Sequence, residues 1–270
     1  MGLSGELPPE LGHLTQMDSF IVKDNEELQG GIPSSLGHLE KLKQLGISFT
    51  SLEGTIPPEI FRATSMRYLN LQNNELEGPI PPDVDMVSSL EKIILSNNRL
   101  DGSIPWESFA SSSLHLIALG NNQLTGSIDP IIGSFSKLRF LYLEKNKLGG
   151  KIPSQIGDIG SLLSLNLDHN FFDVTIPSDI GRLSGLEYLS IQYNQLTGSI
   201  PTEVKGLTKL RTLALGGNKL TGELPDLFPL TNLKNLYLFG NELGGVVPGY
   251  IYDLESLGEL PTAKTNVLPD

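Results

Sequence analysis

Asparagine recurs every 24 residues along this chain from Asn74 to Asn218, and Asn241 follows after 23 more. The same apolar residues return around each of these asparagines, as the stretch from Leu186 to Pro201 illustrates. A strict internal period of this length is typical of a repeat array, in which one supersecondary motif is copied and stacked. Each copy alone would expose its leucine and isoleucine side chains on both open sides, so only stacking on its neighbours buries them.

The order of residues within one repeat predicts the path of the chain. Stretches such as residues 69–71 alternate apolar and polar residues, which indicates a short parallel strand with one buried face. The asparagine that follows can bind backbone groups at the turn, so stacked copies predict an asparagine ladder. Glycine and proline then turn the chain. The remaining residues are too few for a long helix, so we expect a 3₁₀ segment or one helical turn on the outer side.

The 270 residues are predicted to form one continuous solenoid, because a repeat array grows in one dimension. About ten repeats are expected within residues 17–260, with a half repeat in residues 1–16 and a degenerate end in residues 261–270. An array normally needs caps that cover its terminal core. We therefore expect that an N-terminal cap is missing or that the chain is a fragment, and that the residues after Leu257 form a weak cap or a linker.

Composition excludes several classes of function. The formal charge is −12, whereas nucleic-acid binding needs clustered lysine and arginine, so no nucleic-acid partner is expected. The absence of cysteine excludes disulfides, cysteine-based zinc sites and a thiol nucleophile. No apolar run approaches the roughly 18 residues of a membrane span. The first residues also lack the charged and apolar regions of a secretory signal.

Four repeats depart from the pattern, one of them by having Asp129 at the usual proline position. The first complete repeat is one residue longer than the others and places Glu26 and Glu27 directly after Asn25. Thr50 replaces the asparagine of the second repeat, and Val174 replaces a glycine. These departures are interpreted either as neutral variation in tolerant turns or as local kinks and partner-specific features.

The repeat Leu-X-X-Leu-X-Leu-X-X-Asn-X-Leu-X-Gly-X-Ile-Pro, present from Leu186 onward, resembles the plant-type leucine-rich repeat, and the resemblance covers Leu3 to about Leu260. It implies an α/β fold, namely a right-handed, curved and twisted solenoid. Short parallel strands would lie on the concave face and 3₁₀ or helical turns on the convex face. The Leu-X-Gly-X-Ile-Pro segment is expected to form a second short strand.

The same resemblance suggests function. Repeats of this type are typical of the ectodomains of plant receptor-like kinases and receptor-like proteins, of polygalacturonase-inhibiting proteins, and of related algal and diatom proteins. The chain carries no kinase signature, so any signalling enzyme would lie on another polypeptide or a missing segment. The resemblance favours an extracellular or cell-surface location, and the sequence itself leaves the cytoplasm open.

Side chains alternate across a strand, so the residues between the buried leucines should line the concave face. Asn70, Ser164 and Ser190 are among the residues expected there. Aromatic residues are frequent on this face and are typical anchors of an interface, although they also pack well on a solvated sheet. The residues predicted to contact a partner are Tyr68, Phe140, Tyr142, Glu144, Asp168, His169, Tyr188, Tyr193, Tyr237 and Phe239.

Four polar residues on adjacent repeats are predicted to form a cluster among these aromatics. A carboxylate beside a histidine can act in catalysis, but such neighbours are more often a surface ion pair worth under about 1 kcal/mol, which is our expectation. No catalytic residue, metal site or cofactor is expected, and the chain is predicted not to be an enzyme. The cluster consists of Glu144, Lys145, Asp168 and His169.

The sequence predicts a non-catalytic recognition module that binds a protein, peptide or glycan through the concave face, as the sensing part of a receptor-like protein. The chain is expected to be a monomer in isolation. One alternative is an inhibitor of a secreted hydrolase, for which the acidic charge would suit a basic enzyme. Another is a structural or surface-adsorbing protein, since some plant repeats of this type bind ice.

Overall fold

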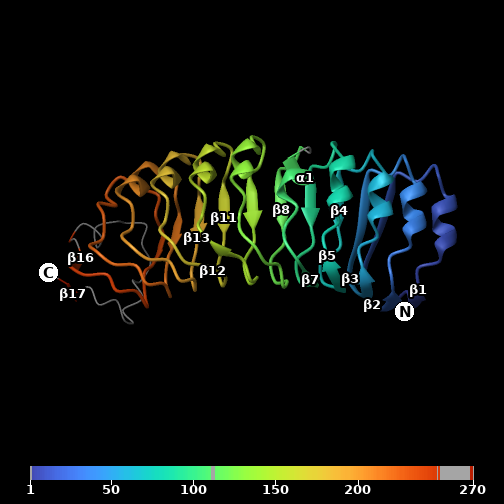
Figure 1. The fold of residues 1–270 in the computed structure, drawn as a ribbon, viewed down its shortest axis with the longest axis horizontal. Coiled ribbons are helices and arrows are strands. Elements are labelled where there is room, and N and C mark those ends of the chain that lie inside the picture. Colours follow the sequence, from blue (N-terminus) through green and yellow to red (C-terminus); the bar gives the residue numbers. More distant parts are fainter. Residues whose placement is uncertain (1, 111–112, 248, 250–267, 270) are drawn as a thin grey trace. The chain divides into compact units, whose positions relative to one another are not determined.

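The computed structural model describes residues 2–110, 113–247, 249 and 268–269. The chain consists of two compact units, Met1–Gly126 and Ser127–Asp270, which are described separately below. Both have the α/β solenoid architecture expected from the repeats, with parallel strands and 3₁₀ turns (Figure 1). That the two units form one continuous array stays a prediction, and the expected repeat at Leu257 lies outside the described residues.

In the first unit, parallel pairing follows the order β1, β2, β3, β4, β6 and β8, while β5 pairs with β3 and β7. One short helical turn follows each strand region (Figure 1). The strands are β1 (Gly5–Glu6), β2 (Ser19–Gly30), β3 (Gln44–Thr55), β4 (Tyr68–Asn70), β5 (Glu75–Pro79), β6 (Lys92–Ile94), β7 (Arg99–Asp101) and β8 (Leu116–Ala118). The turns are η1 (Pro9–His13), η2 (Ser34–His38), η3 (Pro58–Arg62), η4 (Pro82–Met86) and the α-helical α1 (Trp106–Ala110).

In the second unit, β9, β11, β13, β14 and β15 pair in parallel, and β10 pairs with β12. The short pair of β16 and β17 is also parallel. The strands are β9 (Phe140–Tyr142), β10 (Gly149–Gly150), β11 (Ser164–Asn166), β12 (Phe171–Phe172), β13 (Tyr188–Ser190), β14 (Thr212–Ala214), β15 (Asn235–Tyr237), β16 (Val246–Val247) and β17 (Leu268–Pro269). The 3₁₀ turns are η5 (Pro130–Ser134), η6 (Ser154–Asp158), η7 (Ser178–Arg182) and η8 (Thr202–Gly206).

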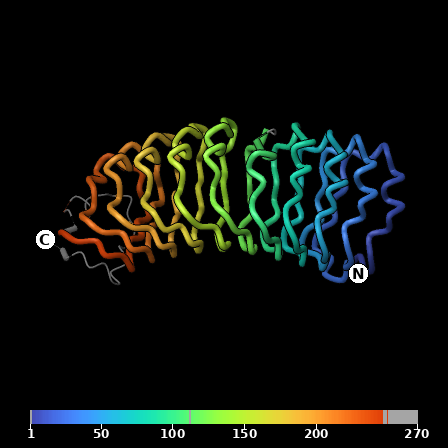
Figure 2. The backbone as a smooth tube through the Cα atoms, viewed as in Figure 1, coloured from blue at the N-terminus to red at the C-terminus, as the bar shows by residue number. Residues whose placement is uncertain are grey.

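The predicted asparagine ladder is confirmed. Each repeat is one coil of the backbone (Figure 2), and its asparagine joins that coil to the preceding one. In a representative coil, Nδ2 of Asn170 donates to the carbonyl of Leu167 at 3.2 Å and to that of Leu143, one coil earlier, at 2.9 Å. Its Oδ1 accepts from the amide of Leu148 at 3.0 Å. The buried amides therefore satisfy backbone groups that the turns would otherwise leave unpaired.

The departures from the repeat pattern have structural counterparts. The extra residue after Asn25 is accommodated by a register shift between β2 and β3. The hydroxyl of Thr50 donates to Oδ1 of Asn74, so the ladder continues without an asparagine there. The glycines Gly150 and Gly198 have φ of 72°, whereas Val174 at the equivalent position is not among the residues with positive φ. A β-branched side chain disfavours that conformation, so the turn adopts a different backbone.

The prediction of short strands is wrong for the first two complete repeats. Strands β2 and β3 each run over 12 residues, because the region around the asparagine stays extended and paired with its neighbour. In later repeats the main strand has three residues, and the predicted second strand appears separately as β5, β7, β10 and β12. The helical turn also varies: α1 is an α-helical turn with Trp106 packed edge to face on Phe109, their ring centroids 6.3 Å apart.

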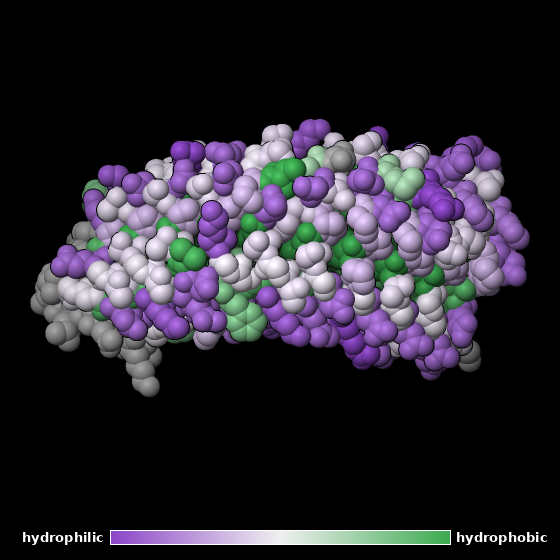
Figure 3. Space-filling view, viewed as in Figure 1, coloured by the Kyte–Doolittle hydropathy of each residue, from purple (hydrophilic) through white to green (hydrophobic). Residues whose placement is uncertain are grey.

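The core of each unit consists of the repeated leucines and isoleucines. The repeat heads Leu42, Met66 and Leu90 in the first unit, and Leu138 and Leu186 in the second, are fully buried. The surface in Figure 3 is accordingly mainly hydrophilic or near neutral, with small apolar patches. The described residues contain no helix that combines the length and hydrophobicity needed to cross a bilayer.

Candidate ligand-binding face

One side of the sheet in the second unit carries most of the residues predicted to bind a partner. We call it the open face: the side chains of β9, β11, β13, β14 and β15 that alternate with buried leucines, together with the second and third residues after each strand. In β9, Leu141 is buried whereas Phe140 and Tyr142 are partly exposed. Strand register aligns Phe140 with Ser164 and Tyr188 across three repeats.

The expectation that Asn70, Ser164 and Ser190 are exposed is wrong. Ser164 and Ser190 are only 8% and 0% exposed, and Asn70 is 8% exposed. Ser164 lies in register with Phe140 and Tyr188 on the neighbouring strands, the Ser190 hydroxyl donates to Asp168 at 2.7 Å, and Asn70 donates to the hydroxyl of Tyr68 at 2.9 Å. On the open face, a small buried serine therefore lies in register between two larger, partly exposed aromatic residues.

Three rings on the open face form a group that we call the aromatic row: His169, Tyr193 and Phe239. The His169 and Tyr193 rings are stacked, with centroids 4.3 Å apart and planes at 15°. The Tyr193 and Phe239 rings have centroids 5.8 Å apart and planes at 56°. Offset and tilted pairs of this kind are favourable arrangements of aromatic rings. Tyr193 is nevertheless 47% exposed, so the row is accessible from solvent.

Two adjacent glycines make room for the row. A Cβ on Gly216 would lie 2.7 Å from the ring of Phe239, and a Cβ on Gly217 would lie 2.8 Å from the ring of Tyr193. Both distances are shorter than carbon contacts in proteins allow. Tyr193 and Phe239 therefore approach each other across the intervening repeat because that repeat has no side chain at these two positions.

The backbone under the aromatic row has an unusual conformation. The residue before each ladder position has positive φ, and in the first unit this position holds Asp24, Phe49, Asn73, Asn97 and Asn121. In the second unit it holds His169 and Tyr193, with φ of 53° and 51°. Asparagine and glycine tolerate this region, whereas a bulky residue there costs about 1 kcal/mol or more. Sequence reasoning missed this feature, although the column of asparagines and glycines was a signal for it.

The polar cluster differs from the ion pair expected from the sequence. Instead of pairing with Lys145 or His169, the carboxylate of Asp168 accepts from the Ser190 hydroxyl at 2.7 and 2.8 Å and from the Gln192 amide at 2.6 Å. Asp168 thereby holds the strand ends of two neighbouring repeats together. These bonds occupy both oxygens of the Asp168 carboxylate.

Glu144 lies next to Asp168 along the same row of repeats. Its Oε2 is buried and has no hydrogen-bond partner in the structure. Burial raises the pKa of the Glu144 carboxyl above 4.5 and the nearby Asp168 adds to this rise, whereas the backbone amide of Glu144 and the charge of Lys145 oppose it. An unpaired buried carboxylate oxygen is unfavourable in the charged form.

This arrangement predicts a pH-dependent effect of Glu144→Gln. A carboxyl whose pKa is raised on folding binds more protons in the native state, so its unfavourable contribution is absent below 4.5 and develops as pH rises through the folded pKa. We expect the variant to match the parent below 4.5 and to be the more stable of the two at neutral pH. Urea unfolding at both pH values checks this. A stability difference independent of pH would contradict it.

The other predicted residues are distributed as follows. The ring centroids of Phe140 and Tyr142 are 6.2 Å apart, and the guanidinium of Arg139 lies 5.7 Å from the Phe140 ring. Burial raises the pKa of Tyr188, a hydrogen bond with Ser190 lowers it, and the charge of Asp168 raises it further. Tyr237 is partly exposed on β15. The second unit thus holds nine of the ten predicted residues, and Tyr68 lies in the first unit.

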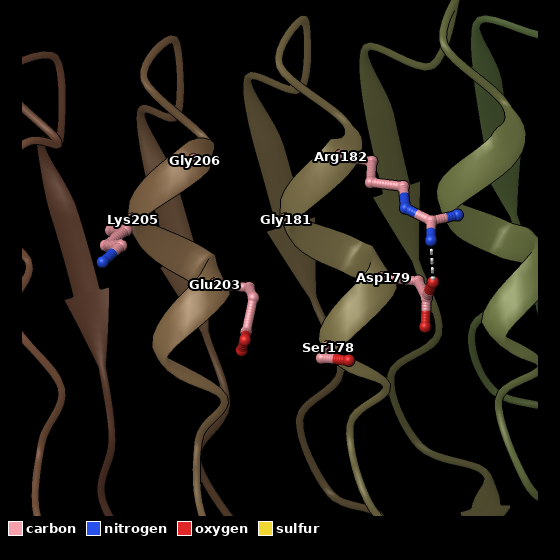
Figure 4. A pocket seen from close by; sticks show the side chains of 7 residues that line it. All are labelled: Ser178, Asp179, Gly181, Arg182, Glu203, Lys205 and Gly206. Carbon is pink, nitrogen blue, oxygen red and sulfur yellow. Dashed lines mark ion pairs between the residues drawn. The ribbon is translucent and has the colours of Figure 1, made fainter.

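A separate hollow of about 360 Å³ lies on the side of the 3₁₀ turns (Figure 4). Arg182 makes ion pairs there with Asp179 at 2.8 Å and with Asp158 at 3.1 Å. The described residues contain no group of three or more histidine, aspartate or glutamate side chains placed to hold a metal ion. The hollow is lined by Ser178, Asp179, Gly181, Arg182, Glu203, Lys205 and Gly206.

Comparison with known proteins agrees with this geometry. Residues 153–220 match a family model described as leucine rich repeat, and residues 65–85, 89–110 and 137–159 match a second model of the same description. Neither description names a catalytic activity. Among curated protein sequences none matches the chain significantly.

Three solved structures illustrate the likeness. The Arabidopsis receptor kinase HAESA, solved with the peptide hormone IDA and the co-receptor SERK1, is 30% identical with a TM-score of 0.83, over 97% of this chain and 48% of that one. A plant ice-binding protein is 27% identical with a TM-score of 0.76, over 99% of this chain and 80% of that one. A repeat protein of Leptospira interrogans is 30% identical with a TM-score of 0.70, over 95% of this chain and 68% of that one.

The chain spans about half the length of the plant receptor chains that it matches, HAESA and the TDR receptor among them. The repeats, the parallel strands, the asparagine ladder and the matches to family models and solved structures all agree. On this combined evidence the chain belongs to the leucine-rich repeat family.

Proposed function

We propose that the chain is the ligand-recognition part of a receptor-like protein and that it binds a peptide on the open face of the second unit. The aromatic row is the observation that carries this proposal. Partly exposed rings held in a fixed arrangement supply large contact areas with little loss of side-chain entropy on binding. The receptor kinase HAESA, to which the chain is similar, was solved with a peptide hormone.

The conformational strain beneath the row supports the same proposal. Lys145, His169 and Tyr193 occupy left-handed positions where asparagine or glycine would be less strained. Strained residues that persist in a regular scaffold are associated with functional sites. The equivalent positions of the first unit hold Asp24, Phe49, Asn73, Asn97 and Asn121, so the scaffold does not itself require a ring.

Polar groups beside the row match the needs of a peptide backbone. The side chain of Gln192 is partly exposed and carries both a donor and an acceptor. An extended peptide carries amides and carbonyls that need such partners once they lose water. The aromatic row would then contact apolar or aromatic side chains of the peptide, while the polar groups would set its position.

The test is capture of ligand by immobilised protein from the peptide fraction of the source organism, followed by mass spectrometry and binding measurements with the synthetic peptide. Changing Tyr193 and Phe239 together to alanine should weaken binding about tenfold or more, since central aromatic anchors dominate interfaces. Phe171→Ala is the matched control, because Phe171 is 52% exposed but lies on β12, away from the open face. It should leave binding unchanged.

Two other results would redirect the proposal. Capture of an intact hydrolase with loss of its activity would support the inhibitor alternative. Equal capture of the peptide by the parent and the double variant would contradict binding on the open face. Circular dichroism should first establish that the double variant has the parent's secondary structure and melting temperature.

Adsorption to a crystalline surface is the second candidate, favoured by one observation. Asn73, Asn97 and Asn121 stand at equivalent positions of three successive repeats, and Nδ2 of Asn121 donates to Oδ1 of Asn97 at 2.8 Å. A plant ice-binding protein has a similar fold. Inhibition of ice recrystallisation by the parent, and its loss in Asn97→Gly, would support this candidate. Glycine tolerates the backbone conformation of Asn97, so the change removes only the side chain.

A further inference from the structure

A hollow of about 630 Å³ lies in the first unit, at the start of three neighbouring strands. It is separate from the open face of the second unit and from the proposed peptide site. Strand register places Gln44, Tyr68 and Lys92 side by side, about 4.8 Å apart from strand to strand. The preceding residues of the same strands complete the lining. The hollow is lined by Lys43, Gln44, Arg67, Tyr68, Glu91 and Lys92.

The backbone beneath this hollow is held firmly. The carbonyl of Lys43 accepts from the amides of Arg67 and Tyr68 at 2.8 and 3.1 Å. The carbonyl of Arg67 accepts in the same way from Glu91 and Lys92 at 2.8 and 3.0 Å. The side chains of the lining therefore start from fixed positions on a paired sheet, which reduces the entropy lost when they converge on a ligand.

The charge of the hollow is opposite to that of the chain. Three of its side chains are cationic and one is a carboxylate, in a protein of formal charge −12. Arg67 lies 3.3 Å from Glu91, and Lys43 lies 3.9 Å from Asp18. The side chains of Arg67 and Lys43 are 63% and 58% exposed, and ion pairs of this kind contribute little stability. Lys92 forms no ion pair with any described residue.

Tyr68 adds an uncharged donor. Its hydroxyl oxygen accepts a hydrogen bond from Nδ2 of Asn70 at 2.9 Å. Because a hydroxyl carries one proton of its own and this bond uses only a lone pair, the Tyr68 proton remains available to an acceptor in the hollow. The side-chain amide of Gln44, on the next strand, offers further N–H donors.

We propose that this hollow binds a compact oxyanion on a ligand, meaning a sulfate, phosphate or carboxylate group. The planar guanidinium of Arg67 fits two oxygens of such a group, and Lys92 and Lys43 neutralise its charge from either side. Glu91 acts as the internal competitor, since its carboxylate holds Arg67 when no ligand is bound. The site gives Tyr68 a role that does not depend on the aromatic residues of the second unit.

The test is a titration of the ¹⁵N-labelled whole chain with sodium sulfate, sodium phosphate and sodium acetate at constant ionic strength, followed by NMR. Amide signals of residues 43–45, 67–69 and 91–93 should shift and saturate. Arg67→Ala should weaken binding about tenfold, because a charge-assisted hydrogen bond contributes this much. Glu91→Gln should tighten binding by a few-fold, because it frees Arg67. Both changes also alter the net charge in the direction of these results, so a control with the same charge change elsewhere in the chain is needed to distinguish a site from a general electrostatic effect.

Arg211→Ala is the matched control. Arg211 also lies 3.3 Å from a glutamate, Glu187, but in the second unit, so its removal should leave binding in this hollow unchanged. Preference for sulfate or phosphate over acetate would identify a tetrahedral group, and the reverse preference would identify a carboxylate. Shifts that grow linearly without saturation, or weaker binding by Glu91→Gln, would overturn the proposal. Neither outcome bears on the peptide site.

Discussion

Replacing Asn170 by alanine is expected to lower the free energy of unfolding by about 3 to 5 kcal/mol, because it removes several buried hydrogen bonds at once. Asn170 is 4% exposed. The change would leave the amide of Leu148 without its side-chain partner, and the carbonyl of Leu143 would keep only the bond that Nδ2 of Asn146 donates at 3.1 Å. Both belong to the preceding coil, so the damage extends across a repeat boundary. Buried backbone groups without partners are among the most destabilising features in a protein.

Urea unfolding followed by circular dichroism measures this effect, and hydrogen exchange shows whether residues around the substitution open first. Asn25→Ala is the control. Asn25 occupies the equivalent ladder position but is partly exposed, and it binds the Leu3 amide and the Lys23 carbonyl where water can replace it. The free energy of unfolding of the Asn25→Ala variant should fall by about 1 kcal/mol or less. Equal losses for the two variants would mean that the ladder does not stabilise the array through burial.

The second large effect is expected for Gly157→Ala. Gly157 lies in η6 against the next 3₁₀ turn, and a Cβ there would be 2.2 Å from the carbonyl oxygen of Asp179 and 2.9 Å from its Cβ. The obstacle is backbone, which cannot move aside as a flexible side chain would. We expect a loss of about 2 to 4 kcal/mol, at the upper end of the usual effect of overpacking.

Gly160→Ala is a close control, because Gly160 lies three residues further along the chain, just after η6 ends. An added Cβ at Gly160 meets nothing within 4 Å, and its φ is not in the left-handed region. This change should be neutral or slightly stabilising, since alanine reduces the entropy of the unfolded chain. Differential scanning calorimetry of both variants compares the two effects directly. A Gly157→Ala protein as stable as the parent would show that neighbouring turns can separate at little cost.

The features predicted correctly from the sequence are those that repeat. The spacing of Asn74, Asn98 and their successors predicts the ladder. One buried side-chain amide recurs at the same turn of every coil, and the groups there that need hydrogen-bond partners are the backbone amides and carbonyls. Alternation within residues 69–71 predicts the strand. The extended β2 and β3 were not predicted, since their length depends on pairing between coils and not on the composition of either coil.

The features that were not predicted depend on the orientation of side chains relative to their neighbours in adjacent repeats. Period-2 alternation assigns Ser164 and Phe140 to the same face but does not predict that Ser164 is buried while Phe140 stays partly exposed. Likewise, Gly216 and Gly217 look like neutral turn residues until the rings of Tyr193 and Phe239 are placed above them. Asp168 was expected to pair with a charge, yet neutral donors of the next repeat were closer.

At the left-handed position before each ladder residue, the chemical type of the side chain varies while the backbone conformation stays the same. Lysine, histidine, tyrosine, phenylalanine, asparagine and aspartate all occupy this position with φ between 51° and 59°. A substitution there changes what the protein presents while the coil beneath it is preserved. Substitutions at these positions, one in each repeat, could therefore change which ligand the protein prefers, and each would cost only a small part of the free energy of unfolding.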